Sequence, residues 1–400
     1  MTARDERKAA SIFSYSLIVM SFTHTLTHIF GGVHTSIFSI LRAEFGLSLQ
    51  QLGIIAAIPP LCQTLLSIPT GLLSDRYGAK RMILLSFSLA TIGAVLASMA
   101  SSPAMFILAI SMVYVNTTIY HPASYSFTTK MFRPQDRPKA LGLHGAGGTL
   151  GHASGPLAVS VLIGILAFQW RQVYLILAVP MIAGIIMVFF IREEPTRDVL
   201  EDLAPVDEAS NGIRSLLTRS LVMFLSFSAL RMVGAAMVNT FLVLYLQDVR
   251  NMSLAYASFI SSSTMLTGFI SAPLGGYVAS RVGEKKWLVV AQALSYVCLA
   301  LSLLVPNVTL FAIFLVGYGF CNTLSMAARN SIMARLSPSN QRGLGFALLF
   351  LPQSLMGAVA PILAGFLAET LGFVTIFYSA LIAYVVGLAV LQFTVKISEH

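Results

Sequence analysis

Residues that can carry positive charge lie inside stretches of the chain that are otherwise apolar. The same stretches hold no acidic residue well inside them, since Asp248 and Glu369 stand only at ends. A charged side chain at the centre of a bilayer costs about 2.5–3.5 kcal/mol even on a lenient scale, so it normally faces a cavity and has a function. The cationic or ionisable residues are His24, His28, His34, His121, His144, His152, Arg231 and Arg329.

Arg231 lies at the middle of its apolar stretch, and no carboxylate nearby in the sequence can neutralise it. An anionic ligand would supply the counter-charge, because a planar guanidinium binds carboxylate, phosphate or sulfonate through paired hydrogen bonds. The alternative is a structural role, in which Arg231 donates to backbone carbonyls of a neighbouring helix. Arg329 stands nearer the end of its stretch, so its head group can equally reach the membrane interface.

Polar residues recur every three or four positions in several apolar stretches, which places each set on one side of a helix. These faces predict the lining of a cavity, although a structural hydrogen bond is an equal alternative for any single histidine. His152 is predicted to be structural. The predicted binding residues are Arg231, His28, His24, His121, Tyr120, Asn116, Asn239, Tyr318, Asn322 and Arg329.

Composition places these residues in a membrane protein. Hydrophobic residues make up 56% of the chain, charged residues 10%, and the mean hydropathy is +0.81, whereas soluble domains carry about 25% charged residues. At roughly 20 residues per crossing, the length allows about a dozen spans. We therefore predict an all-α protein of twelve transmembrane helices, at 12–40, 49–73, 82–100, 103–129, 138–166, 171–191, 216–246, 253–279, 287–304, 308–333, 342–368 and 373–395.

The distribution of charge predicts the topology. Most of the 25 Lys and Arg residues fall in alternate polar segments, and segments rich in these residues are cytoplasmic. Both termini are therefore predicted to be cytoplasmic, and the net charge of +9 reflects topology rather than a nucleic-acid partner. The apolar run from Ile12 is predicted to be the first span rather than a signal peptide. Three separated cysteines, Cys62, Cys298 and Cys321, fit small buried side chains.

The two halves of the chain repeat. The segment Gly71–Arg81 matches Gly276–Lys286, and the same spacing relates Arg137 to Arg342. Parallel repeats of six helices are typical of transporters whose binding site lies between the halves. We predict an N-terminal half at 1–191, a polar cytoplasmic linker at 192–215 and a C-terminal half at 216–400.

The segment Gly71–Arg81 also resembles the signature loop of the major facilitator superfamily, in which an aspartate latches the two halves together. Asp75 matches that aspartate, whereas the second copy has Ser280. Gly147, Gly151 and Gly155 fall on one helix stripe that resembles the helix 5 motif of many antiporters; such a stripe permits close packing and Pro156 permits a bend. The predicted gating residues are Gly71, Asp75, Arg76, Gly78, Lys80, Arg81, Arg137, Gly151, Gly155, Pro156, Gly276, Arg281 and Gly283.

Within the superfamily, the runs at 21–24, 45–53, 120–122 and 147–151 resemble the fosmidomycin-resistance branch, which exports a phosphonate antibiotic. The chain departs from that branch where the branch has acidic residues: His28 and Ala123 stand in their places. A shared substrate and a shared coupling mechanism therefore do not follow from the resemblance.

The resemblance and the cationic residues together predict a secondary transporter of a small organic or phosphorylated anion, with drug efflux as one form, in the inner membrane. Coupling is to protons, with His28 and His121 as carriers because unperturbed histidine has a pKa of about 6.5, or to exchange of anions. The alternative is export of a metal ion or metal chelate by the intramembrane histidines, which the charge of Arg231 disfavours. No metal ligand, cofactor or nucleic-acid partner is predicted, and the chain is predicted to be a monomer. Neither HExxH nor GxSxG nor a carboxylate pair is present, so no enzyme is predicted.

Overall fold

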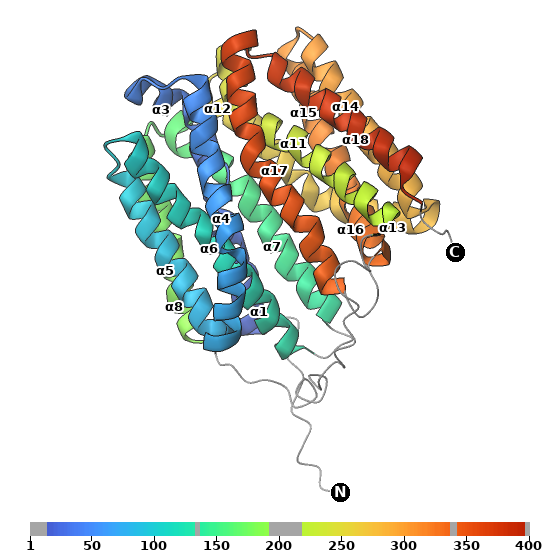
Figure 1. Ribbon diagram of the computed structural model, residues 1–400. Coiled ribbons are helices and arrows are strands. Elements are labelled where there is room, and N and C mark those ends of the chain that lie inside the picture. The colour runs from blue at the N-terminus through green and yellow to red at the C-terminus, as the bar shows by residue number, and fades with distance from the viewer. Residues whose placement is uncertain (1–13, 133–136, 192–217, 337–341, 397–400) are drawn as a thin grey trace, which may run out of the picture. The chain divides into compact units, whose positions relative to one another are not determined.

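The computed structural model describes residues 14–132, 137–191, 218–336 and 342–396, and all regular structure in these ranges is helical. The predicted all-α fold class is therefore confirmed. The predicted linker at 192–215 lies outside the described residues. Figure 1 shows the helices as coiled ribbons.

The helices follow one another in two series. The first is α1 (Tyr15–His28), α2 (Val33–Ser36), α3 (Phe38–Phe45), α4 (Leu49–Tyr77), α5 (Ala79–Ser98), α6 (Pro103–Met131), α7 (Arg137–Ala158), the π-helix η1 (Val159–Ile165) and α8 (Trp170–Phe189). The second is α11 (Arg219–Asp248), α12 (Leu254–Leu266), α13 (Gly268–Val282), α14 (Glu284–Leu304), α15 (Val308–Leu324), α16 (Met326–Leu336), α17 (Arg342–Leu371) and α18 (Thr375–Thr394).

Packing divides the chain into two units. Unit 1 contains the described residues of Met1–Gly31, Leu65–Ser154 and Arg171–Ser210. Unit 2 contains those of Gly32–Thr64, Gly155–Trp170 and Asn211–His400. Unit 2 therefore combines the helices of the C-terminal half with two segments of the N-terminal half.

Among the described residues, 11 helical segments are long and apolar enough to cross a membrane. The remaining predicted span, at 253–279, is present as α12 and α13, which are separated at Thr267 and are individually too short to qualify. The predicted number of crossings is thus consistent with the structure once these two helices are taken as one interrupted span.

Other spans are also interrupted. The first span breaks between α1 and α2, where Gly32 has φ of 78°, a conformation that glycine adopts without a Cβ clash. The tenth breaks at Ser325, between α15 and α16. Irregular backbone at membrane depth is tolerated where it is buried in protein or lines a cavity. His28 and Arg329 each lie within a few residues of such a break.

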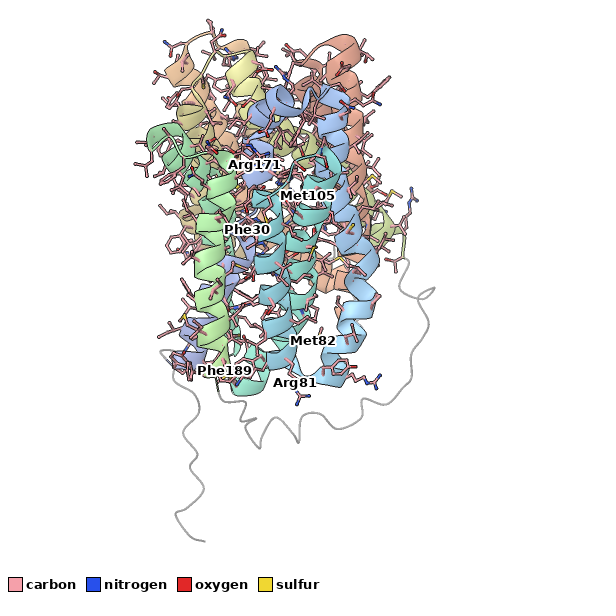
Figure 2. The ribbon with its side chains drawn as sticks, turned by 90° about the vertical axis from the view of Figure 1, so that its left-hand side faces the viewer. Phe30, Arg81, Met82, Met105, Arg171 and Phe189 are labelled. Atoms are coloured by element: carbon pink, nitrogen blue, oxygen red, sulfur yellow. The ribbon has the colours of Figure 1, made fainter. Side chains whose placement is uncertain are left out.

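The sequence repeat has a structural counterpart. Gly78 and Gly283 occupy matching positions and have φ of 83° and 96°. Lys80 donates to two carbonyls at the end of α8, at 2.8 and 2.7 Å, and Lys285 donates to two at the end of α18, at 3.0 and 2.7 Å. Figure 2 labels Phe189, one of these acceptors, and Arg81, the residue after Lys80. Each lysine thus satisfies carbonyls that a helix end leaves without partners.

Segments from both sequence halves meet inside unit 2. Arg42 Nη1 of α3 lies 2.7 Å from Asp248 Oδ2 at the end of α11. The carboxylate of Glu369, near the end of α17, accepts from the backbone N–H of Leu49 at 2.8 Å. This negative charge lies at the N-terminus of α4, where unpaired N–H groups and the helix dipole favour it.

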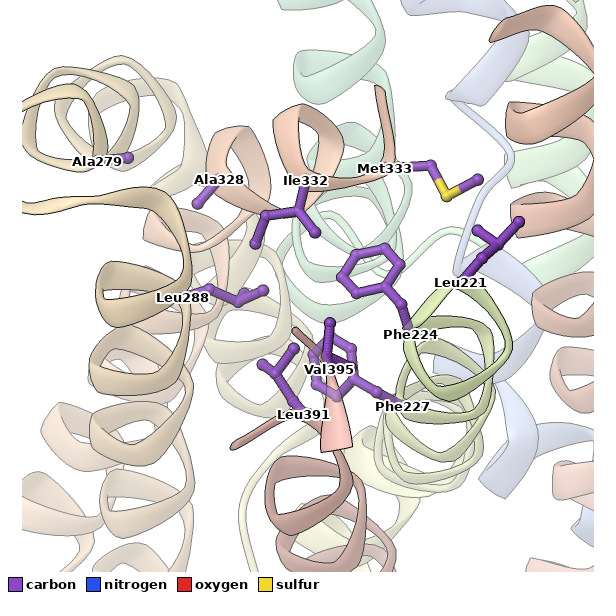
Figure 3. Close-up of a cluster of buried hydrophobic side chains, with 10 residues drawn as sticks. All are labelled: Leu221, Phe224, Phe227, Ala279, Leu288, Ala328, Ile332, Met333, Leu391 and Val395. Atoms are coloured by element: carbon purple, nitrogen blue, oxygen red, sulfur yellow. The ribbon is translucent and has the colours of Figure 1, made fainter. Parts of the chain in front are cut away.

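An apolar core anchors the helices that carry the candidate site in unit 2 (Figure 3). Phe227 of α11 is fully buried in this core and lies one turn before Arg231. The core residues are Leu221, Phe224, Phe227, Ala279, Leu288, Ala328, Ile332, Met333, Leu391 and Val395.

Candidate functional site

Histidines from α1, α6 and α7 gather inside unit 1. The ring centroids of His24 and His144 lie 4.1 Å apart, and those of His28 and His152 lie 3.9 Å apart. His121 of α6 lies between the two histidines of α1, at 5.2 Å from His24 and 5.1 Å from His28. We call these five residues the histidine cluster.

Three Nε2 atoms of the cluster converge. His121 Nε2 lies 3.3 Å from His24 Nε2 and 3.2 Å from His28 Nε2, and one ring nitrogen of each of the three residues lies within 4.8 Å of those of the other two. The other ring nitrogens of two of these residues are held by carbonyls: His24 Nδ1 lies 2.7 Å from His144 O, and His121 Nδ1 lies 2.7 Å from Thr117 O.

These carbonyl contacts fix the tautomers of two rings. A carbonyl oxygen only accepts, so Nδ1 of His24 and of His121 carries the hydrogen, and each Nε2 is left with a lone pair when the ring is neutral. Those two lone pairs face each other across 3.3 Å. His144 Nδ1 likewise lies 3.1 Å from a carbonyl, Met20 O, but its Nε2 lies 3.4 Å from Ser124 Oγ, a hydroxyl that can donate to it.

Glycines in α7 allow α1 to approach closely enough to form the cluster. A Cβ at Gly147 would lie 2.2 Å from the backbone oxygen of Ser21, and one at Gly151 would lie 2.3 Å from that of Thr25. A Cβ at Gly148 would lie 2.7 Å from the His24 ring. The close approach is strengthened by a hydrogen bond from Thr25 Oγ1 to Gly147 O at 2.9 Å.

Two predicted binding residues of α6 have different surroundings. The hydroxyl of Tyr120 lies 2.8 Å from Thr23 Oγ1 and donates to Met20 O at 2.9 Å, so it joins α6 to α1 and is fully buried. Asn116 is also buried, yet neither polar atom of its side chain has a partner among the described residues. A buried amide without partners is costly, which keeps Asn116 as a candidate for contact with a ligand.

Arg231 lies in the middle of α11, in unit 2, with only 8% of its surface exposed. Its Nε has no hydrogen-bond partner among the described residues, and the same holds for Nε of Arg329 in α16. Within the described part of the chain neither guanidinium forms an ion pair with a carboxylate. The two arginines are close enough to interact electrostatically, which is unfavourable for like charges.

Tyrosines surround Arg231. Tyr296, Tyr318 and Tyr384 all lie within electrostatic range of its guanidinium. The hydroxyls of Tyr318 and Tyr384 lie 2.6 Å apart, and the rings of Tyr296 and Tyr384 stack with centroids 4.4 Å apart. Gly234 permits this arrangement, since a Cβ there would lie 2.6 Å from the Tyr384 ring.

A chain of amide and hydroxyl groups continues from the tyrosines. Tyr296 donates to Gln292 Oε1 at 2.5 Å, and Gln292 donates to Asn322 Oδ1 at 3.2 Å. Gln292 also donates to the hydroxyl of Ser325, the residue at which the tenth span is interrupted. This network holds the polar face of α15 against α14.

The predicted binding residues therefore fall into two groups, each inside one unit. Asn239 of α11 is exposed rather than clustered with Arg231. Sequence reasoning missed Tyr296 and Gln292 of α14 and Tyr384 of α18, because it considered mainly the cationic residues and the spans that carry them. The spacing of Gln292 and Tyr296, one helical turn apart, is the signal that could have found them.

Several predicted gating residues can be placed. Arg76 and Arg281 lie over the rings of Tyr77 and Tyr277, at 5.5 and 4.9 Å from the centroids. Pro156 contacts the interruption of the first span, since a Cβ at Gly32 would lie 3.0 Å from its ring. Arg81 is exposed, Gly155 is buried, and Gly276 has room for a Cβ. The side chains of Asp75 and Arg137, and the surroundings of Gly71, lie outside the described residues.

The family model of the Major Facilitator Superfamily matches residues 20–262 and 224–400. Because these matches cover most of the chain, the protein belongs to the Major Facilitator Superfamily. It is therefore a multi-pass membrane transporter rather than an enzyme. This confirms the family that the segment Gly71–Arg81 predicts.

Known proteins of several kinds are similar to it. The riboflavin transporter RibZ of Clostridioides difficile (strain 630) is 23% identical over 400 residues, which cover 87% of this chain and 86% of RibZ. The fosmidomycin resistance protein of Escherichia coli (strain K12) is 23% identical over 286 residues, covering 71% and 69%. The crystal structure of a bacterial homolog of the human lysosomal transporter Spinster, inward-facing and occupied, has a TM-score of 0.81 at 17% identity and covers 94% and 95%. This last likeness shows the fold.

Proposed function

We propose that the protein moves a small organic or phosphorylated anion, such as a phosphonate, across the inner membrane by alternating access. The observation that carries the proposal is the pair Arg231 and Arg329. Both have a buried Nε without a partner, and no carboxylate neutralises either of them in the described part of the chain. Buried charges are ordinarily paired, so a ligand that supplies negative charge completes this site.

The surroundings of Arg231 suit an oxyanion. Guanidinium groups bind carboxylate and phosphate through two parallel hydrogen bonds, and two neighbouring guanidiniums favour a ligand with more than one acidic oxygen. The hydroxyls of Tyr318 and Tyr384 are hydrogen-bonded to each other, and the one that accepts keeps its own O–H for a further hydrogen bond to the ligand. The similarity to the fosmidomycin resistance protein supports export of such a compound, and the chain is proposed to act as a monomer.

Contacts between the sequence halves support alternating access. The ion pair of Arg42 with Asp248 and the bond from Leu49 to Glu369 join segments on the side predicted to face outward. Both contacts are small and polar, so an alternating carrier can break them during its cycle without exposing a large apolar surface.

The unpaired arginines also support exchange of one anion for another. A carrier that returns empty must reorient while Arg231 and Arg329 repel each other without a counter-charge. We expect uptake of a labelled phosphonate or dicarboxylate into proteoliposomes to be at least about tenfold faster with unlabelled anion inside, since an extra barrier of about 1.4 kcal/mol gives that factor. The measurement is initial uptake into preloaded and empty vesicles.

An imposed pH gradient is the control for this exchange. Uptake into empty vesicles that follows the gradient would favour proton coupling instead, with His28 and His121 as the residues to replace. A screen in which no organic or phosphorylated anion is transported under either condition, although the protein is folded, would refute the anion proposal.

We also predict cytoplasmic termini, and the described residues offer a matched pair of positions to test this. Ala43 of α3 and Ser280 of α13 are both exposed, and the charge pattern puts them on opposite sides of the membrane. In a background without Cys62, Cys298 and Cys321, an impermeant maleimide should label Ala43→Cys in intact cells. It should label Ser280→Cys only after lysis, and the reverse pattern would overturn the topology.

A further inference from the structure

We infer that His24, His28 and His121 form a binding site for a divalent transition-metal ion, with their three Nε2 atoms as ligands. The site lies wholly within unit 1, on α1 and α6. It is separate from the arginines of the proposed anion site, and neither proposal depends on the other. The sequence raised metal binding by the intramembrane histidines only as the disfavoured alternative, in the form of metal export.

The spacing of the ligand atoms fits a tetrahedral ion. A zinc–nitrogen bond is about 2.0–2.1 Å long, which places two nitrogens of one tetrahedral site about 3.3 Å apart. The distances from His121 Nε2 to His24 Nε2 and to His28 Nε2 are 3.3 and 3.2 Å. One ring nitrogen of each of the three residues lies within 4.8 Å of those of the other two, so a small rotation of one ring completes the set.

The ring nitrogens that would not bind the metal, Nδ1 of His24 and of His121, have the hydrogen bonds that metal-binding histidines usually have. Histidines that bind metals usually donate the other N–H to a carbonyl or carboxylate, which fixes the tautomer and the ring orientation. His24 donates from Nδ1 to His144 O and His121 donates from Nδ1 to Thr117 O, each at 2.7 Å. Both Nε2 lone pairs therefore point into the space between the three rings.

Neutral histidines cannot satisfy these contacts by themselves. Nε2 of His28 can carry a hydrogen and donate it to His121, but the lone pairs of His24 and His121 then still face each other. A proton added to His24 would let it donate to His121 as well, but the single lone pair of His121 Nε2 would then have to accept from two N–H groups. A metal ion accepts all three lone pairs, and it is the occupant that leaves none opposed.

The donor set selects the class of metal. Imidazole nitrogens suit Zn²⁺, Ni²⁺, Cu²⁺ and Co²⁺, whereas Mg²⁺ and Ca²⁺ prefer oxygen ligands. No carboxylate lies in the histidine-bearing spans. Three protein ligands also leave one position of a tetrahedral ion open for water or for a donor atom of another molecule.

The test uses the purified full chain in detergent, without a histidine tag and freed of metals by a chelator. Titration with Co²⁺ should produce the visible absorption of a four-coordinate nitrogen-ligated ion at one ion per chain, and Zn²⁺ should displace it. His121→Gln should weaken binding at least about 100-fold, since even the loss of an outer-shell partner costs 10–100-fold. Zn²⁺ should raise the unfolding temperature of the parent and not that of His121→Gln.

His34→Asn is the matched control, because His34 is a buried histidine of the same span that lies in α2, outside the cluster. It should bind Co²⁺ like the parent. If His121→Gln does not fold, His24→Gln is the second variant, since its amide can donate to His121 Nε2 and relieve the opposed lone pairs. Absence of Co²⁺ absorption in the parent, or equal binding by the parent and the cluster variants, would overturn the metal site.

Discussion

Replacing Arg231 by glutamine is expected to weaken binding of the transported anion by about 2–5 kcal/mol, the range measured when one partner of a buried charge pair is removed. At about 1.4 kcal/mol per factor of ten, this corresponds to roughly 30- to 4000-fold. The expectation follows from the burial of Arg231, with 8% of its surface exposed, and from the lack of an acidic partner in the described chain. Binding is measured by calorimetry or ligand-induced thermal stabilisation.

Arg231→Lys should have a smaller effect. Lysine keeps the positive charge but offers a point charge in place of the planar fork, so bidentate binding is lost while the Coulomb attraction remains. Without ligand, the order of the parent and the two Arg231 variants in thermal stability should differ from their order in affinity for the anion. Removal of an unpaired buried charge relieves its desolvation cost, so Arg231→Gln should unfold at the same or a higher temperature than the parent.

A control on the same helix tests whether the loss of any positive charge would weaken anion binding. Arg219 lies in the first turn of α11 and is exposed, so Arg219→Gln should bind the anion like the parent. If Arg231 instead donates to backbone carbonyls of a neighbouring helix, Arg231→Gln should make the protein less stable. If Arg231→Gln binds normally but unfolds at a clearly lower temperature, Arg231 serves to bond neighbouring carbonyls and the anion site must lie elsewhere.

The fold could be predicted from the sequence to a large extent, because hydropathy and charge are local properties. The spans, the helical class and the repeat of Gly71–Arg81 in Gly276–Lys286 required no knowledge of tertiary contacts. Interruptions within spans were harder to predict. Ser325 divides two helices with no glycine or proline directly beside it, so the sequence near it gives no sign of the break.

The candidate site could be predicted only in part. Helical spacing placed His24 and His28 on one face of a helix, but the position of His121 Nε2 between them depends on how α6 packs against α1. Tyr384 was missed because its role depends on contact with Gly234 of α11, far away in the sequence. Residue types thus indicated the chemistry, whereas the partners of each group depended on helix packing.

The packing of α7 against α1 gives the second large effect. Gly147→Ala is expected to destabilise the protein by about 1–3 kcal/mol, the usual cost of overpacking, although alanine gains up to about 1 kcal/mol in helix propensity. The added Cβ would lie 2.2 Å from the backbone oxygen of Ser21, and that oxygen cannot rotate away as a side chain can. Separation of the helices should also loosen the bond from His24 Nδ1 to His144 O. Thermal unfolding in detergent measures the change.

Gly145→Ala is the matched control, two residues earlier in the same helix. A Cβ at Gly145 meets nothing within 4 Å, so only the gain in helix propensity remains and the unfolding temperature should stay the same or rise. Each variant adds one methyl group to α7, and only the position differs. The difference between their changes in unfolding temperature therefore reports the contact of the added Cβ at position 147 with α1. Equal unfolding temperatures for Gly147→Ala and Gly145→Ala would show that α1 and α7 are not packed backbone to backbone at this point.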